Sequence, residues 1–170
     1  MSARVQHHVS GRLSLRPPQA ESLERLKQAL DAAPEMLTQE RNVPAVLATL
    51  KAQFPKLEDF EREFPSLCFA LATGVGKTRL MGAFIAYLHL AHGIDNFFVL
   101  APNLTIYNKL ITDFTPNTPK YVFKGIGEFA LNAPRVITGD NYDQQNIFGG
   151  ELLGEVRINI FPGAAPVPVP

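Results

Sequence analysis

Two glycines, a lysine and a threonine stand close together in the segment Ala72-Thr73-Gly74-Val75-Gly76-Lys77-Thr78. Glycines at 74 and 76 let the backbone turn tightly and approach a ligand with no Cβ in the way. Successive N–H groups in such a turn form a concave site for an anion. The ammonium of Lys77 can reach phosphate oxygens, and the hydroxyl of Thr78 can ligate Mg²⁺. These residues predict a phosphate-binding loop, called the phosphate loop below.

The flanking segments decide between a phosphate loop and an ordinary glycine turn. Residues 66–71 form a short apolar run after a proline, which predicts a buried strand. Cys68 lies in this run and is expected to be a core thiol. Residues 78–92 read as a mostly apolar helix that Gly93 ends. Leu71 stands where the strict pattern has its first glycine, but the looser pattern fits in full. Strand, loop and helix in this order favour phosphate binding.

Strands and helices alternate after the phosphate loop. We expect a strand at 97–101, a helix at 104–114, short strands at 121–123 and 135–138, and a last, half-exposed strand at 156–160. This order is typical of a parallel, doubly wound α/β sheet.

Composition changes along the chain suggest four parts. Residues 1–15 form an N-terminal arm, either a short strand or a loose segment. Residues 16–65 are helical, with an apparent insertion at 35–64. Residues 66–161 hold the phosphate loop and the alternating elements. Residues 162–170 contain four prolines, so we expect a disordered, polyproline-like tail.

The charge balance limits the kinds of partner. The 16 basic and 16 acidic residues cancel, so any contact with nucleic acid must be a local patch. No apolar run approaches the ~20 residues that span a bilayer, and the N-terminus lacks a secretory signal pattern. A soluble, cytoplasmic protein is therefore expected.

Several segments together resemble superfamily-two helicases and translocases. The phosphate loop looks like their first motif, and residues 98–105 resemble the next, a strand that ends in a proline-containing turn. Leu15-Arg16-Pro17-Pro18-Gln19 resembles their adenine-contacting element. The amino-acid sequence of residues 97–114 is most similar to the Res subunit of type III restriction enzymes, and residues 136–142 resemble that group as well.

The resemblance implies a RecA-like P-loop NTPase lobe that binds ATP and Mg²⁺. Residues 73–78 would then hold the phosphates, with Thr78 on the metal. Gln19 would hydrogen-bond the adenine edge with Arg16 in support. A solvated helix start is the plain alternative for these two residues.

The resemblance also implies DNA as a partner. Pro102, Asn103 and Thr105 would contact the DNA backbone, with Lys109 as a nearby positive charge. The alternative for Asn103 is a plain helix cap, because asparagine is favoured there. The turn Thr138-Gly139-Asp140 is open to either interpretation, backbone contact or simple turn. A modification methyltransferase subunit is a further possible partner in such a system.

One departure from the family concerns catalysis. An ATPase of this class needs an acidic pair after a later strand, for Mg²⁺ and for the attacking water. No apolar strand in these 170 residues leads into Asp-Glu, and Asp140 lacks a second acid. We therefore expect an incomplete sheet, in a chain cut short before this motif, and little hydrolysis by the chain alone.

Two other classes of function compete with the motor interpretation. A non-enzymatic nucleotide- or DNA-binding remnant would also carry a phosphate loop. A small P-loop kinase would need an arginine-rich lid, and the residues after Phe114 hold few arginines. A GTPase would need Asn-Lys-x-Asp, whereas Asn108-Lys109 is followed by Leu110-Ile111.

Overall fold

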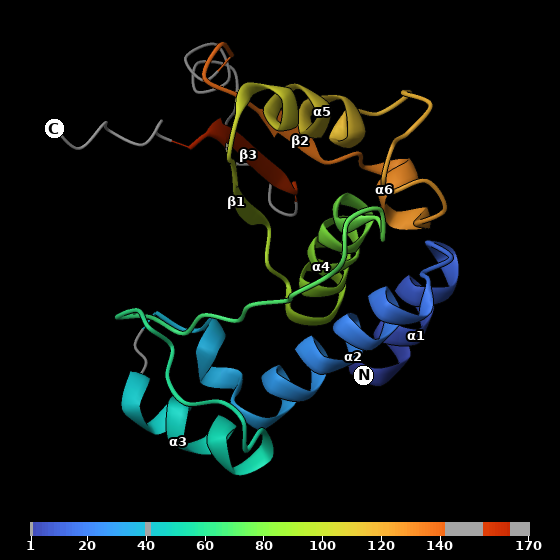
Figure 1. The fold of residues 1–170 in the computed structure, drawn as a ribbon. Helices are drawn as coiled ribbons and strands as arrows, with labels where there is room; N and C mark the ends of the chain where they lie inside the picture. The colour runs from blue at the N-terminus through green and yellow to red at the C-terminus, as the bar shows by residue number, and fades with distance from the viewer. Residues whose placement is uncertain (1, 40–41, 142–154, 164–170) are drawn as a thin grey trace, which may run out of the picture.

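Three parallel strands form a sheet in the part of the chain that the structure describes, in the order β1-β3-β2 (Figure 1). The structure is a computed structural model, and it describes residues 2–39, 42–141 and 155–163. The strands are β1 Asn96–Ala101, β2 Arg135–Ile137 and β3 Arg157–Pro162. The helices are α1 Ser2–Arg12, α2 Pro17–Ala32, the 3₁₀ helix η1 Pro34–Leu37, α3 Val43–Gln53, α4 Lys77–His92, α5 Leu104–Phe114 and α6 Gly127–Leu131.

The last strand of the sequence lies in the middle of this sheet. Ile158 of β3 is in register with Phe97 of β1 and with Val136 of β2. Ile158 and Ile160 are 0% exposed, whereas the residues on either side of Ile158 are partly exposed. The alternation at 156–160 thus confirms a strand. Pairing along both edges buries it more deeply than the pattern alone suggested.

The expected strand before the phosphate loop is absent, because residues 66–71 form neither strand nor helix. Leu67 and Phe69 turn inward, and the Phe69 ring contacts that of Phe84 on α4, with centroids 4.8 Å apart. Cys68 is exposed, so its prediction as a core thiol is wrong. The physical reason is that no described strand pairs with this segment, so its alternate side chains are only partly buried.

Two further secondary-structure predictions are wrong. The N-terminal segment forms helix α1 instead of a strand or loose arm, because Val9 and Leu13 recur at helical spacing and are buried in the core. Residues 121–123 belong to a turn and form no strand. The N–H of Val122 bonds the carbonyl oxygen of Asp113 at the end of α5 (2.9 Å), so this segment closes the helix and adds nothing to the sheet.

The predicted helical insertion is helical only in part. Helix α3 and most of η1 fall within 35–64, and residues 54–64 form turns, bends and irregular chain. Val46 and Leu50 of α3 pack with Ala29, Ala33 and Phe60 in a small core of their own. The division of the chain into four parts stays a prediction, and residues 164–170 of the expected tail lie outside the described residues.

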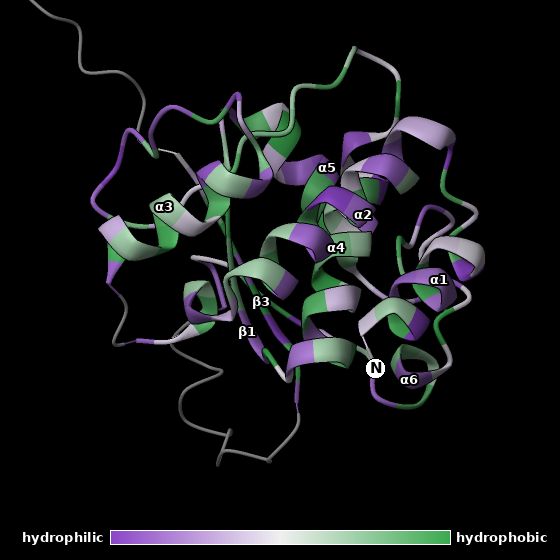
Figure 2. Cartoon of the chain, turned by 90° about the horizontal axis from the view of Figure 1, so that it is seen from below, coloured by the Kyte–Doolittle hydropathy of each residue, from purple (hydrophilic) through white to green (hydrophobic). Residues whose placement is uncertain are grey.

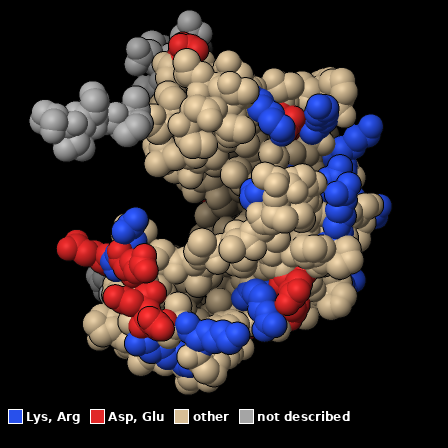
Figure 3. Space-filling view, in the orientation of Figure 1, with Lys and Arg blue, Asp and Glu red and all other residues tan. Residues whose placement is uncertain are grey.

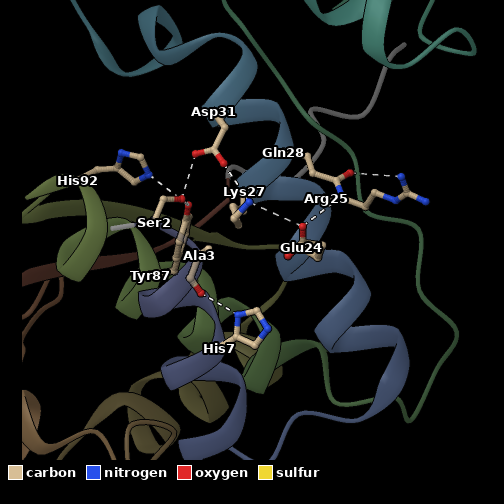
Figure 4. A network of polar contacts seen from close by, with 10 residues as sticks. All are labelled: Ser2, Ala3, His7, Glu24, Arg25, Lys27, Gln28, Asp31, Tyr87 and His92. Carbon is tan, nitrogen blue, oxygen red and sulfur yellow. Dashed lines mark hydrogen bonds and ion pairs between the residues drawn. The ribbon is translucent and has the colours of Figure 1, made fainter.

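A polar network ties α1 and α2 to α4 (Figure 4). The hydroxyl of Ser2 donates to Asp31 (3.0 Å) and also bonds the hydroxyl of the buried Tyr87 (2.7 Å). Lys27 pairs with Asp31 at 2.9 Å. His92 lies 3.4 Å from the Tyr87 hydroxyl, and burial lowers the pKa of its imidazole. This network fixes the helix that carries the phosphate loop at its other end.

The main core gathers around α4 and the sheet. In Figure 2 the hydrophobic residues of α4, β1 and β3 lie toward the middle of the molecule, and α1 and α2 show hydrophilic residues outward. Val99 and Ala101 of β1 are buried in this core. The alternate side chains Phe98 and Leu100 are 67% and 62% exposed. Phe98 stacks on Phe161 of β3 with ring centroids 5.2 Å apart, and these three side chains are called the exposed sheet face.

Candidate phosphate-binding site

The phosphate loop leads directly into helix α4, and Gly76 is the N-cap of this helix. Gly74 and Gly76 have φ angles of 80° and 91°. Residues with a Cβ rarely adopt such angles, so both turns need glycine. The loop therefore makes the tight turns that its two glycines predicted.

The start of α4 offers unpaired donors to a ligand. Among the described residues, the backbone N–H groups of residues 74–79 donate to no acceptor. The next one, that of Leu80, donates to the Gly76 carbonyl oxygen (3.2 Å). The earlier N–H groups have no intrahelical acceptor, and the helix dipole adds positive potential there. Lys77 donates from Nζ to the carbonyl oxygen of Ala72 (3.1 Å). Free backbone donors at a helix N-terminus are suited to an anion such as phosphate.

Gln19 and Arg16, from the start of α2, lie against the phosphate loop. The Gln19 side chain is 1% exposed. Its Nε2 donates to the Gly76 carbonyl oxygen (2.8 Å), and its Oε1 accepts from the Arg16 N–H (2.8 Å). The Arg16 guanidinium lies 3.4 Å from the Gly74 carbonyl oxygen. The structure thus brings both predicted residues to the loop, where their recorded partners are backbone atoms.

Lys109 of α5 also reaches the phosphate loop. Its Nζ donates to the Thr78 Oγ1 (3.2 Å) and pairs with the carboxylate of Asp113. The Asp113 side chain is 6% exposed. The family resemblance grouped Lys109 with the DNA-contacting residues, and Asp113 was not expected to act as a catalytic acid because no strand leads into it. The signal that could have found the pair is the four-residue spacing of opposite charges on one helix.

The phosphate loop opens onto a cavity of about 790 Å³ whose charged lining residues are mostly basic. One acidic side chain, Asp113, lines it. Its basic lining residues are Arg12, Lys77, Arg79, Lys109, Lys120 and Lys124. Figure 3 shows Lys and Arg side chains gathered around α5 and the neighbouring edge of the molecule, with few acidic ones among them. A cleft lined by one sign of charge concentrates ligands of the opposite sign.

Another cavity, of about 730 Å³, lies between α2, α3 and residues 57–69. Its lining includes Phe54, Leu57, Phe60, Phe64 and Phe69 and four charged residues. It does not include the phosphate loop, so the two cavities are separate sites.

The residues predicted to contact DNA stand at the beginning of α5. Asn103 is the N-cap of this helix, and its side chain accepts from the Ile106 N–H (2.9 Å). Pro102 and Thr105 are exposed beside it. The ammonium of Lys109 is bonded to Thr78 and Asp113. Contact with DNA stays a prediction for all of them.

The side chain of Asn141 holds the turn that follows β2. Asn141 accepts from the Thr138 N–H (2.8 Å) and donates to the Val136 carbonyl oxygen (3.3 Å). Tyr142, the last residue of the family-like segment, lies outside the described residues.

The donor set limits how Mg²⁺ could be held. Among the described residues, no group of three or more His, Cys, Asp and Glu gathers in one place. Thr78 lines the cavity together with Thr73, Gly74, Gly76 and Lys77 of the loop. Such an arrangement fits a metal that phosphate oxygens and one protein hydroxyl share, and it does not fit a metal held by protein ligands alone.

A parallel α/β fold with a glycine loop at a helix N-terminus defines a P-loop nucleotide-binding domain. The chain belongs to the type III restriction enzyme res subunit family, whose model matches residues 12–151. This family is a P-loop helicase domain, and its members are in general ATP-hydrolysing, helicase-type enzymes. No curated protein and no solved structure matches the chain. In the described part of the chain, no helix is both long and apolar enough to cross a bilayer.

Proposed function

We propose that the phosphate loop binds the triphosphate of ATP together with Mg²⁺, and that the chain is the ATP-binding part of a DNA-dependent translocase subunit. One observation carries this proposal. Gly74 and Gly76 adopt positive φ angles at the start of α4, and the loop they shape opens onto a cavity with six basic side chains. Family membership supports ATP as the nucleotide.

The residues of the phosphate loop would act as follows. Lys77, now on the Ala72 carbonyl oxygen, would turn to the β- and γ-phosphates, and Thr78 would ligate Mg²⁺. The N–H groups at residues 73–78 would cradle the phosphate oxygens. Bound Mg²⁺ supplies neutralisation of phosphate charge in such sites.

DNA and a methyltransferase subunit are the proposed partners. Pro102, Asn103 and Thr105 lie exposed at the N-terminal end of α5, where backbone N–H groups and short polar side chains suit a sugar-phosphate backbone. Such contacts would hold a strand without reading its sequence.

Sustained hydrolysis is not expected of the 170-residue chain alone. Positioning the attacking water calls for an acidic pair, and no apolar strand in the sequence leads into Asp-Glu. Binding and turnover should therefore separate in the purified protein.

The test is calorimetric titration of the purified chain with Mg·ATP, repeated for Lys77→Ala. We expect saturable binding by the wild type and a loss of at least about tenfold in the variant, since it lacks a charge-assisted contact. Lys51→Ala, at an exposed position of α3, is the matched control and should bind as the wild type does. Absence of any nucleotide binding by the folded wild type would overturn the proposal.

Titration with DNA and with GTP, together with thermal melting, separates the competing classes. DNA binding with no effect of ATP on the melting temperature would favour a non-enzymatic remnant, since a ligand of the folded state must stabilise it. Preference for GTP would point to a GTPase.

A further inference from the structure

The ammonium group of Lys109 lies beside the Thr78 hydroxyl, the group that would ligate Mg²⁺. Lys109 Nζ is 3.2 Å from Thr78 Oγ1. Two positive charges this close to one oxygen repel each other. Mg²⁺ bound at the Thr78 hydroxyl would therefore repel the Lys109 ammonium and favour its movement away from Thr78.

The position of Lys109 is built into α5. Asp113, one helical turn further on, accepts from Nζ, and its own side chain is 6% exposed. The Asp113 carbonyl oxygen also accepts from the Val122 N–H (2.9 Å), so the end of the helix that carries the carboxylate is anchored. An ordinary surface pair of this spacing would stand in solvent on both sides. This one has a buried acid and a third partner on another element.

We propose that Lys109, held by Asp113, serves as a resident cation of the phosphate site. When no metal accompanies the nucleotide, the Lys109 ammonium neutralises phosphate charge beside Thr78. When Mg²⁺ is present, Lys109 moves away and leaves the Thr78 hydroxyl free to ligate the metal. The site then accepts metal-free ATP as well as Mg·ATP. This inference rests on the proposed binding of ATP at the phosphate loop.

The test is calorimetric titration of the 170-residue chain with ATP, in excess Mg²⁺ and again in excess EDTA. The informative variant is Lys109→Met combined with Asp113→Asn, because the single change would leave a buried carboxylate unpaired. Lys109→Met alone is measured beside it. Circular dichroism verifies that each variant is folded. Lys120→Met is the matched control, since Lys120 lines the same cavity and lies outside the contacts of Thr78.

We expect the double variant to lose about tenfold or more in affinity in EDTA, the size of one charge-assisted contact. In excess Mg²⁺ its affinity should stay within about threefold of the wild type, a difference well under one such contact. Lys120→Met should lower affinity by a similar, smaller factor under both conditions, because it changes only the general field of the cavity.

Equal losses with and without Mg²⁺ in the double variant, or no loss in either, would overturn the role of Lys109 while leaving ATP binding intact. The same Mg²⁺-dependent pattern in Lys120→Met would also overturn it. A wild type that binds ATP under neither condition refutes the proposed function itself, and the resident cation with it.

Discussion

The side-chain amide of Gln19 donates to the carbonyl oxygen of Gly76 across 2.8 Å, and so joins the start of α2 to the N-cap of α4. The residues are 57 positions apart in the chain. Burial of Gln19 keeps this bond away from competing water. The shape of the phosphate loop thus depends on a side chain outside the loop.

Gln19→Ala should loosen the phosphate loop. Loss of the amide leaves the Arg16 N–H without its partner and removes one of the two hydrogen bonds to the Gly76 carbonyl oxygen, so we expect a destabilisation of about 1–3 kcal/mol in urea unfolding. Nucleotide affinity should fall by a similar factor for ATP and GTP, because both amide atoms are bonded to backbone. Gln28→Ala, on the same helix and away from the loop, is the control. A loss confined to ATP would instead indicate contact with adenine.

Gly76→Ala should be more damaging than an ordinary glycine replacement. A Cβ at this position would lie 2.7 Å from the Gln19 Nε2, and the φ angle of 91° is itself unfavourable. We expect a cost of at least about 1–3 kcal/mol, measured by thermal unfolding, and loss of ATP binding. Gly11→Ala in α1 meets nothing within 4 Å and should instead stabilise by about 0.5 kcal/mol. Equal effects of the two changes would contradict this account of the loop.

Stability should decline on mild acidification, in part through His92. Burial lowers the pKa of His92 below its ordinary 6.5, opposed by the charge of Asp31. Above that pH the imidazole is neutral in both states. As pH falls below it, the unfolded chain binds the proton more readily, so the free energy of unfolding decreases. His92→Gln should flatten this decline between about pH 7 and 5. An unchanged slope of urea midpoint against pH would refute the assignment.

The sequence predicted elements whose own residues suffice to define them. Helix α5 was placed at its observed bounds because it is amphipathic and begins with an asparagine cap. Strand β1 and the end of α4 at Gly93 were recognisable for similar local reasons. Segment 66–71 has the composition of a strand, but a strand also needs a hydrogen-bonded neighbour, which local sequence does not reveal.

The candidate site was predictable in its loop and not in its surroundings. Glycines at 74 and 76 predict tight turns from local sequence alone, independently of the rest of the chain. The contact of Gln19 with Gly76 and that of Lys109 with Thr78 depend on how α2 and α5 pack, which is set by distant residues. The family-like motifs indicated that Gln19 belongs near the nucleotide, and they gave no hint of its backbone partners.

The exposed sheet face has a practical consequence for every measurement described above. Phe98 and Leu100 present apolar surface to water, and parallel sheets are usually covered on both sides. Contiguous apolar surface of this kind drives reversible self-association as concentration rises. Heats of dilution and light scattering should therefore be recorded alongside each titration. Replacing Leu100 with lysine offers a version of the chain suited to concentrated samples.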